Sequence, residues 1–193
     1  MVGNDYEDDE TFLTPEEREE LEEPQPAAAP ITFRSQDFDV KGLVNRLESK
    51  DILVPRIRMA SEDQSVCSLS PFQRGFVWNK KQMDLFIESL LLEYPIPGLF
   101  LVQQTDRRLL VLDGQQRLET LRRFYSGLNG DKKYRLKLTG SKFDGFSYDE
   151  LPQQFRRIID NTYITTTVIV LDNRPESNNA VYDVFKRLNS GGT

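Results

Sequence analysis

The segment that most constrains the fold is residues 109–125, LLVLDGQQRLETLRRFY. Its apolar start is typical of a buried strand, and its second half repeats apolar residues at helical spacing. Only Asp113 and Gly114 separate the expected strand from the expected helix, and Gly127 is a natural stop for that helix. The apolar positions of the helix are Leu118, Leu121, Phe124 and Tyr125. We therefore expect a sheet with at least one helix packed directly against it.

Further helices and strands are expected before this segment. Periodicity predicts a helix over residues 40–47 and a short strand over residues 52–55. The clearest helix follows the capping pair Asn79 and Gln82 and ends at the prolines of YPIPG. Its apolar positions are Met83, Phe86, Ile87, Leu90 and Leu91. A strand over residues 99–103 then leads through a hairpin-length turn into the strand described above.

The later part of the chain continues the mixture. We expect a strand over residues 134–138, a helix begun by Ser147 and Glu150, and a β-branched strand over residues 164–171. The apolar positions of a last helix are Val181, Val184, Phe185 and Leu188. Because helices and strands alternate irregularly and one hairpin is expected, the pattern favours a mixed α+β domain over a regular doubly wound sheet.

Charge divides the chain into an arm and a domain. Residues 1–30 contain eleven acidic side chains and one arginine, a net charge of −10, and end in the linker PQPAAAP. We interpret them as a flexible, solubilising arm with one short helix begun by Thr14 and Pro15; the alternative is a mimic that competes with an acidic ligand. Residues 31–193 carry a net charge of +4, which is compatible with a polyanionic partner without demanding one.

The absence of histidine from the 193 residues excludes several kinds of chemistry. A histidine-activated serine or cysteine nucleophile and a nuclease with a histidine base cannot be built. With one cysteine there is no internal disulfide and no ordinary structural zinc site. Any metal must bind oxygen ligands, which indicates Mg²⁺. Catalysis would depend on carboxylate, amide, guanidinium and backbone groups.

The sequence has neither a membrane-length apolar run nor the basic-then-apolar start of a signal peptide. We therefore expect a cytoplasmic protein with no membrane partner.

The turn DGQQR, residues 113–117, has two interpretations. In the structural one, Asp113 caps the helix, Gln116 completes a capping box and Arg117 is solvated. In the functional one, the backbone amides at Gly114 and the positive end of the helix dipole bind phosphate. Arg117 would then contact phosphate oxygens, Gln115 and Gln116 would hold a ribose, a base or a water, and Asp113 would bind the metal.

Two other polar clusters accompany this turn. PFQRGFVW places Gln73 and Arg74 among aromatic residues, where they either make an exposed cation–π contact or bind a ligand. FKRLNSGGT brings Asn189 to a basic helix end, where the structural alternative is a complement to the helix dipole.

Taken together and in order, four segments resemble one known family: PFQRGFVW, EYPIPGLFL, VLDGQQRLETL and VFKRLNSGGT. They are similar to the N-terminal domain of the GmrSD-type restriction enzymes, the bacterial family with a DGQQR motif, over about residues 35–193. That family resembles the ParB and sulfiredoxin fold, so the resemblance implies an α+β, ParB-like mixed sheet with flanking helices over residues 31–193. It also implies helical segments continuing beyond Thr193.

The resemblance implies a nucleotide-binding, NTP-hydrolysing sensor domain of a modification-dependent, anti-phage restriction system. It gives catalytic roles to Asp113, Gln115, Gln116 and Arg117, with Asp113 as the ligand of Mg²⁺. The phosphate-binding residues that it implies are Gln73, Arg74, Gly114, Arg117 and Asn189, and Gly192 also matches the family pattern. Glutamines stand where a sulfiredoxin needs cysteine, so sulfinic acid reduction is not expected.

The expected partners are a nucleotide and modified DNA, reached directly or through a nuclease domain in a C-terminal segment or a separate protein, and a homo-oligomer is possible. Two other functions remain open: a non-catalytic, ParB-like nucleotide or DNA adaptor, and a metal-dependent DNA nuclease that uses the same site. Phosphate release, binding without release and plasmid nicking distinguish the three.

Overall fold

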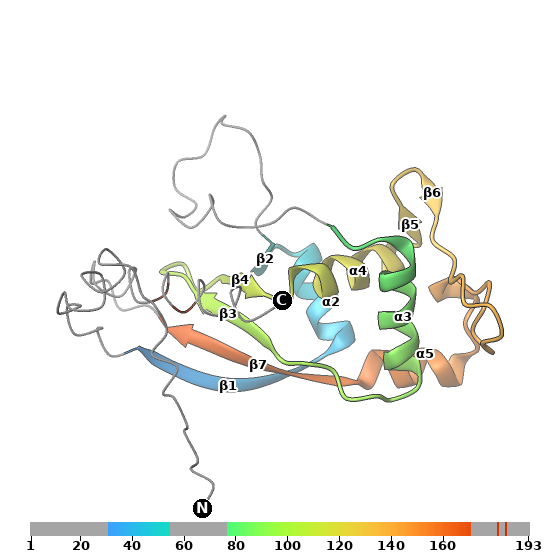
Figure 1. Ribbon diagram of the computed structural model, residues 1–193. Coiled ribbons are helices and arrows are strands. Elements are labelled where there is room, and N and C mark those ends of the chain that lie inside the picture. Colours follow the sequence, from blue (N-terminus) through green and yellow to red (C-terminus); the bar gives the residue numbers. More distant parts are fainter. Residues whose placement is uncertain (1–30, 55–76, 171–180, 182–183, 185–193) are drawn as a thin grey trace, which may run out of the picture.

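The computed structural model describes residues 31–54 and 77–170, together with Val181 and Val184 (Figure 1). The acidic arm and its linker lie outside the described residues. So do Gln73, Arg74, Asn189 and Gly192. Within the described part, no helix is long and apolar enough to span a membrane.

The centre of the fold is a mixed five-stranded sheet with strand order β1-β7-β3-β4-β2. β1 pairs antiparallel with β7, β7 lies parallel to β3, β3 pairs antiparallel with β4, and β4 lies parallel to β2. The strands span Thr32–Asp39 (β1), Ile52–Leu53 (β2), Leu99–Gln103 (β3), Leu109–Asp113 (β4) and Tyr163–Val170 (β7). The predicted α+β class with a mixed sheet and flanking helices is therefore confirmed.

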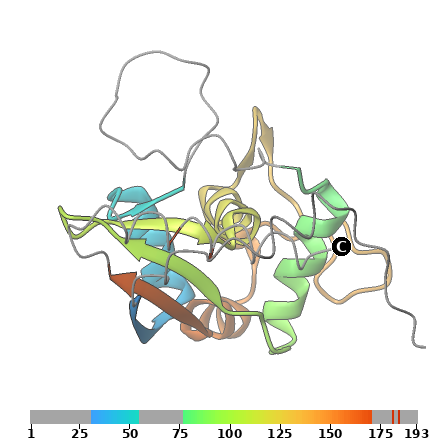
Figure 2. The same ribbon diagram turned by 60° about the vertical axis from the view of Figure 1, so that its left-hand side comes forward.

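The main core fills the space between one face of this sheet and four helices. The helices span Val40–Glu48 (α2), Lys80–Leu91 (α3), Gln115–Ser126 (α4) and Gln153–Asn161 (α5), and they gather beside the sheet in both ribbon views (Figures 1 and 2). Leu101 and Val111 of the sheet are fully buried, as are Leu118 and Leu121 of α4. Burial of these side chains supplies the main driving force for folding.

The opposite face of the sheet has a smaller apolar cluster. Val102, Leu110, Leu112 and Ile169 are buried there together with Val181, which lies in a helix. The predicted last helix is thus confirmed at its two described positions, whereas Phe185 and Leu188 lie outside the described residues.

Most of the predicted elements are present with the expected boundaries. Asn79 and Gln82 form the capping box of α3, and Gly127, with φ of 71°, ends α4. The hairpin between β3 and β4 is also confirmed. Two elements were missed: β1, whose side chains are mostly exposed, and the small hairpin of β5 (Leu128–Asn129) and β6 (Lys132–Lys133).

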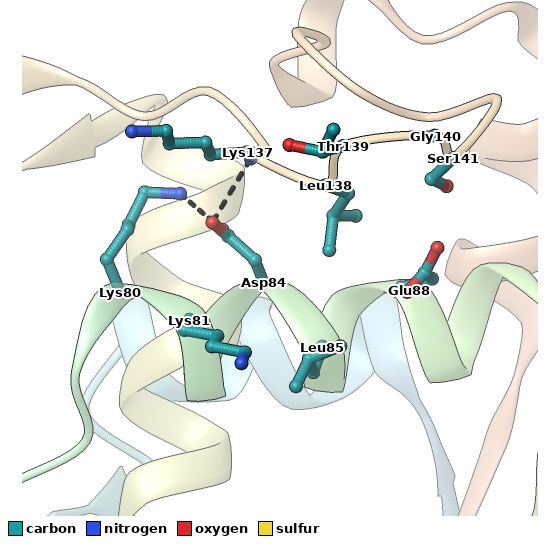
Figure 3. Close-up of a pocket in the computed structure, with 10 residues that line it drawn as sticks. All are labelled: Lys80, Lys81, Asp84, Leu85, Glu88, Lys137, Leu138, Thr139, Gly140 and Ser141. Atoms are coloured by element: carbon teal, nitrogen blue, oxygen red, sulfur yellow. Dashed lines mark hydrogen bonds and ion pairs between the residues drawn. The ribbon is translucent and has the colours of Figure 1, made fainter.

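The predicted strand over residues 134–138 is wrong, although its side chains do alternate between buried and exposed. The segment joins no described sheet, because side chains and loop residues form hydrogen bonds with its backbone. Asp84 of α3 accepts a hydrogen bond from the Lys137 amide at 3.1 Å (Figure 3). Lys80 donates one to the Arg135 carbonyl at 2.6 Å. Side chains of α3 thus bind two backbone groups of the segment, and the Leu136 amide donates to the Phe146 carbonyl instead of to a strand.

The predicted start of the last full helix is displaced. Glu150 does accept a hydrogen bond from the Ser147 amide at 3.3 Å, but these residues bound the short 3-10 turn η2, Tyr148–Glu150. Helix α5 begins only at Gln153, after Pro152, because proline fits the start of a helix and disfavours the helical conformation of the residue before it.

Candidate functional site

The DGQQR turn lies where β4 passes into α4, as predicted. β4 ends at Asp113, and Gly114 is the N-cap of α4 in a left-handed conformation with φ of 98°. A Cβ atom at Gly114 would lie 2.2 Å from Leu99 Cδ2. Both the backbone angle and the close approach of Leu99 therefore require glycine here.

The predicted capping box at this turn is wrong. Gly114 takes the N-cap position and makes no side-chain cap bond. This shift moves Asp113 one residue outside the helix, where its Oδ2 accepts a hydrogen bond from Arg117 Nη2 at 2.9 Å. Gln116 Oε1 accepts hydrogen bonds from the amides of Val77 and Trp78. Asp113 thus binds a side chain of α4, and Gln116 binds the backbone of a distant segment; neither caps the backbone at the start of α4.

Arg117 forms hydrogen bonds on both sides of the turn, so the interpretation of a solvated side chain is wrong. Its guanidinium donates to the carbonyls of Pro97 and Gly98 and to Asp113, and its side chain is only 11% exposed. Burial lowers the pKa of Arg117 below its ordinary value, while the charge of Asp113 and its hydrogen bond oppose that shift. Because arginine stays protonated, Arg117 brings a fixed positive charge to the turn.

The carboxylate of Asp113, which is paired with Arg117, faces solvent. Its side chain is 45% exposed, and Arg117 holds one of its two oxygens. The described residues contain no group of three acidic, cysteine or histidine side chains that could enclose a metal. A single carboxylate instead fits Mg²⁺ in its usual setting, in which one or two carboxylates share the ion with substrate phosphates and water. Gln115 lies beside Asp113, half-buried.

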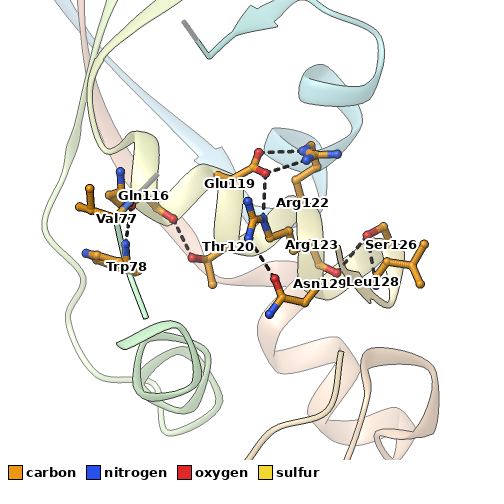
Figure 4. Close-up of polar contacts among 10 residues, drawn as sticks. All are labelled: Val77, Trp78, Gln116, Glu119, Thr120, Arg122, Arg123, Ser126, Leu128 and Asn129. Carbon is orange, nitrogen blue, oxygen red and sulfur yellow. Dashed lines mark hydrogen bonds and ion pairs between the residues drawn. The ribbon is translucent and has the colours of Figure 1, made fainter. Parts of the chain in front are cut away.

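Gln116 joins the turn to a segment distant in the sequence. Its Oε1 lies 2.9 Å from the Val77 nitrogen and 3.0 Å from the Trp78 nitrogen, as Figure 4 shows for the Gln116 side chain beside these residues. Val77 and Trp78 end the motif PFQRGFVW, which contains Gln73 and Arg74. The structure therefore brings the described end of that motif to the first turn of α4.

The rest of α4 is held by ion pairs. Glu119 accepts hydrogen bonds from Arg122 and Arg123, and Arg123 also donates to Asn129 Oδ1 (Figure 4). Burial raises the pKa of Glu119, but the hydrogen bonds and charges of the two arginines outweigh it, so the pKa lies below its ordinary value. Arg123 thus links α4 to the β5–β6 hairpin, and both arginines are paired with Glu119.

The sequence did not predict two pairs of partners in the site, and all four are backbone groups. The carbonyls of Pro97 and Gly98 hold Arg117, and the amides of Val77 and Trp78 hold Gln116. The one available signal was the pair of prolines in YPIPG, because Pro95 and Pro97 keep that segment out of a helix and leave its carbonyls available.

A groove of about 760 Å³ lies away from this turn, between α3 and residues 137–141 (Figure 3). Its charged side chains are of both signs: Lys80, Lys81 and Lys137 are offset by Asp84 and Glu88. The groove therefore does not provide the one-sided positive charge expected of a polyanion site.

Comparison with known proteins gives one match. Neither the curated proteins nor the solved structures contain one that matches this chain. The family described as "GmrSD restriction endonuclease, N-terminal domain" matches residues 57–193, which include the DGQQR turn, helix α3 and the segments that contain Gln73, Arg74 and Asn189. This chain therefore belongs to the family of GmrSD restriction endonuclease N-terminal domains.

Proposed function

We propose that this domain binds and hydrolyses a nucleoside triphosphate as the sensor of a modification-dependent DNA restriction system. Membership of the GmrSD N-terminal family gives the link to restriction. The observation that carries the nucleotide part is the Asp113 carboxylate, which a buried guanidinium holds at a glycine turn before a helix.

The turn has the chemistry of a phosphate site. A helix N-terminus presents backbone amides and the positive end of a dipole. Arg117 adds a fixed positive charge beneath the turn. Its contacts with Pro97, Gly98 and Asp113 occupy part of its donor set, so its contribution is the orientation of Asp113 and long-range stabilisation of phosphate charge.

Direct contacts to the phosphates would come from Arg74 and Gln73, with Asn189 contributing from the last motif. Arg74 is three residues before Val77, which lies at the first turn of α4. Arginine is suited to this role because its planar donors match phosphate oxygens in pairs. Gln115 would orient the attacking water, since an amide can both donate to and accept from it.

Asp113 would hold Mg²⁺ together with the phosphates. When bound, the ion would neutralise charge that develops on the phosphates during transfer. The residues of the chain would position the nucleotide, and Arg117 would keep Asp113 oriented. Recognition and cleavage of modified DNA would depend on further domains or on a partner, and the nucleotide state of this domain would control them.

The decisive experiment measures phosphate release from ATP, GTP, CTP and UTP with and without Mg²⁺ and DNA. We expect release with at least one nucleotide and Mg²⁺, and loss of release in Asp113→Asn with nucleotide binding reduced less than tenfold. Binding without release would support the adaptor instead, and nicking of plasmid DNA without added nucleotide would support the nuclease.

Asp106→Asn is the matched control. Asp106 is also an exposed aspartate paired with an arginine, at 2.5 Å from Arg108 Nε, but it lies in the turn at the other end of β4. Equal loss of activity in both variants would show that the effect does not come from the DGQQR turn.

A further inference from the structure

We propose that the outer face of helix α3 is an interface between two copies of this chain, which meet in an antiparallel arrangement. This inference concerns assembly and does not depend on the proposed nucleotide chemistry. It rests on a stripe of side chains along α3, in which exposed apolar residues flank charges of opposite sign, and on the groove beside that stripe.

Helical spacing places Lys81, Leu85, Glu88 and Leu92 on one stripe of α3 and its C-cap. Steps of four, three and four residues keep side chains on one side of a helix. The stripe faces away from the core, because the buried residues of α3 are at the other positions. Leu85 is 45% exposed, Leu92 is 38% exposed, and Val77, just before the helix, is 65% exposed. Single exposed leucines are common on protein surfaces, but apolar residues that share one line indicate a contact surface.

The two charges of the stripe are available for a partner. Within the described part of the chain, the side chains of Lys81 and Glu88 form no ion pair or hydrogen bond. The charge of Lys80, by contrast, is paired with Asp84. Lys81 and Glu88 are two turns of helix apart, about 10 Å along the axis, so they cannot pair with each other inside one copy.

The groove beside α3 has the same division of charge. Its volume is about 760 Å³ (Figure 3). Lys137 lies near the first turn of α3, and Glu88 lies two turns later, beneath Ser141. The exposed Leu85 side chain lines the groove between these ends. The groove thus has a basic end, an apolar middle and an acidic end.

An antiparallel second copy matches this order of groups. A two-fold axis at Leu85 brings the two Leu85 side chains together and places Lys81 of each copy beside Glu88 of the other. Such an axis makes both surfaces identical, so each contact occurs twice. It also brings Val77 of one copy towards Leu92 of the other, since the two residues lie at nearly equal distances from Leu85 along the sequence. A partner of one charge would match only one end of the groove.

Charge reversal tests this arrangement in the full chain. We expect the wild-type chain to dimerise reversibly with a Kd on the order of 10 µM, because one helix and one short segment from each copy make a small interface. Lys81→Glu and Glu88→Lys each place like charges at both contacts. Each variant should therefore weaken the Kd at least about tenfold, as measured by sedimentation equilibrium.

Combining the two reversals identifies the antiparallel contact. The double variant Lys81→Glu, Glu88→Lys has opposite charges at both contacts again, so its Kd should return to within about threefold of the wild-type value. An equimolar mixture of the two single variants should form a heterodimer of similar affinity, because each chain supplies the charge that the other needs. Lys50→Glu is the matched control: Lys50 is an exposed lysine that does not line the groove, and its reversal should leave the Kd unchanged.

Leu85→Ser tests the apolar centre. It should weaken the Kd at least about tenfold, since both copies lose the contact, and leave urea unfolding of the dilute monomer unchanged. A wild-type chain that stays monomeric up to about 1 mM would overturn the proposal. So would a dimer that the single reversals leave intact, because another face would then form it. Failure of both the double variant and the mixture to restore the dimer would likewise exclude the antiparallel copy.

Discussion

Two ion pairs of this domain have the same spacing of four residues and opposite burial. In α3, Asp84 is paired with Lys80, and the carboxylate is 1% exposed while the lysine is 35% exposed. At the start of α4, Asp113 is paired with Arg117, and here the carboxylate is 45% exposed while the arginine is 11% exposed. In both pairs the more buried member also binds the backbone of an irregular segment.

This difference separates a charge that the fold uses fully from one that the fold leaves partly to solvent. The inward-facing Asp84 uses its oxygens on Lys80 and on the Lys137 amide, so the bonds within the protein account for it. The outward-facing Asp113 receives one bond from a cation that is itself buried. Structural contacts leave part of its carboxylate to solvent, which is the arrangement that a ligand needs.

The largest effect should come from breaking the buried carboxylate. Asp84→Ala leaves the Lys137 amide without its acceptor and Lys80 without its counter-ion, so we expect a loss of roughly 3 kcal/mol in the free energy of unfolding. Urea denaturation measures it. Asp84→Asn, which retains an acceptor for the amide, should lose less. A loss below about 1 kcal/mol would show that Asp84 does not anchor residues 134–138.

Gly114→Ala tests the turn that presents the exposed carboxylate. We expect a loss of about 2 kcal/mol, because alanine is strained at positive φ and its Cβ would meet Leu99 Cδ2. The matched control is Gly127→Ala: φ is also positive there, but nothing lies within 4 Å of the added atom. We expect about 1 kcal/mol for the control, and equal losses in thermal or urea unfolding would contradict the close approach of Leu99.

Asp113→Ala should barely change stability, in contrast to Asp84→Ala. The carboxylate is 45% exposed and solvent screens its pair with Arg117, so we expect a change below about 1 kcal/mol in urea unfolding. Phosphate release should nevertheless be lost. A loss of stability as large as that of Asp84→Ala would remove the distinction between the two pairs.

The smallest effect concerns the pH dependence of the exposed ion pairs of Glu150 with Lys133 and Arg135. Hydrogen bonds from Lys133 and Arg135 lower the pKa of Glu150 from 4.5 to about 2. Because the pKa in the folded state is depressed, its stabilisation is present above about pH 4.5 and is lost as the pH falls towards 2. Glu150→Gln should therefore reduce the slope of stability against pH in this range only, as measured by urea unfolding at several pH values. An unchanged slope would contradict the pairing.

Elements with strong local signals could be predicted from the sequence. Helix α3 follows from its capping box and apolar spacing, and β4, the glycine turn and α4 follow from an apolar run, Gly114 and a second apolar spacing. β1 could not be recognised, because this strand lies at one edge of the sheet, exposes most of its side chains and shows no apolar alternation.

Errors arose where the partner is distant in the sequence. Residues 134–138 alternate like a strand, yet their hydrogen-bonding partners include Asp84, more than fifty residues earlier. The cap assigned to Asp113 and Gln116 was reasonable locally, but the partners of Gln116 are the backbone of Val77 and Trp78. The turn itself was predictable, whereas the side chains that hold it together depend on tertiary contacts.

The sheet order has a practical consequence for the limits of this domain. The family match begins at residue 57, whereas β1 and β2, the two outermost strands, come from residues before it. A fragment cut at that boundary would leave β7 without eight paired residues and β4 without its parallel neighbour, and would also remove α2 from the core. Two bare strand edges invite association between molecules. Expression of a piece with the complete sheet therefore has to start no later than Ile31.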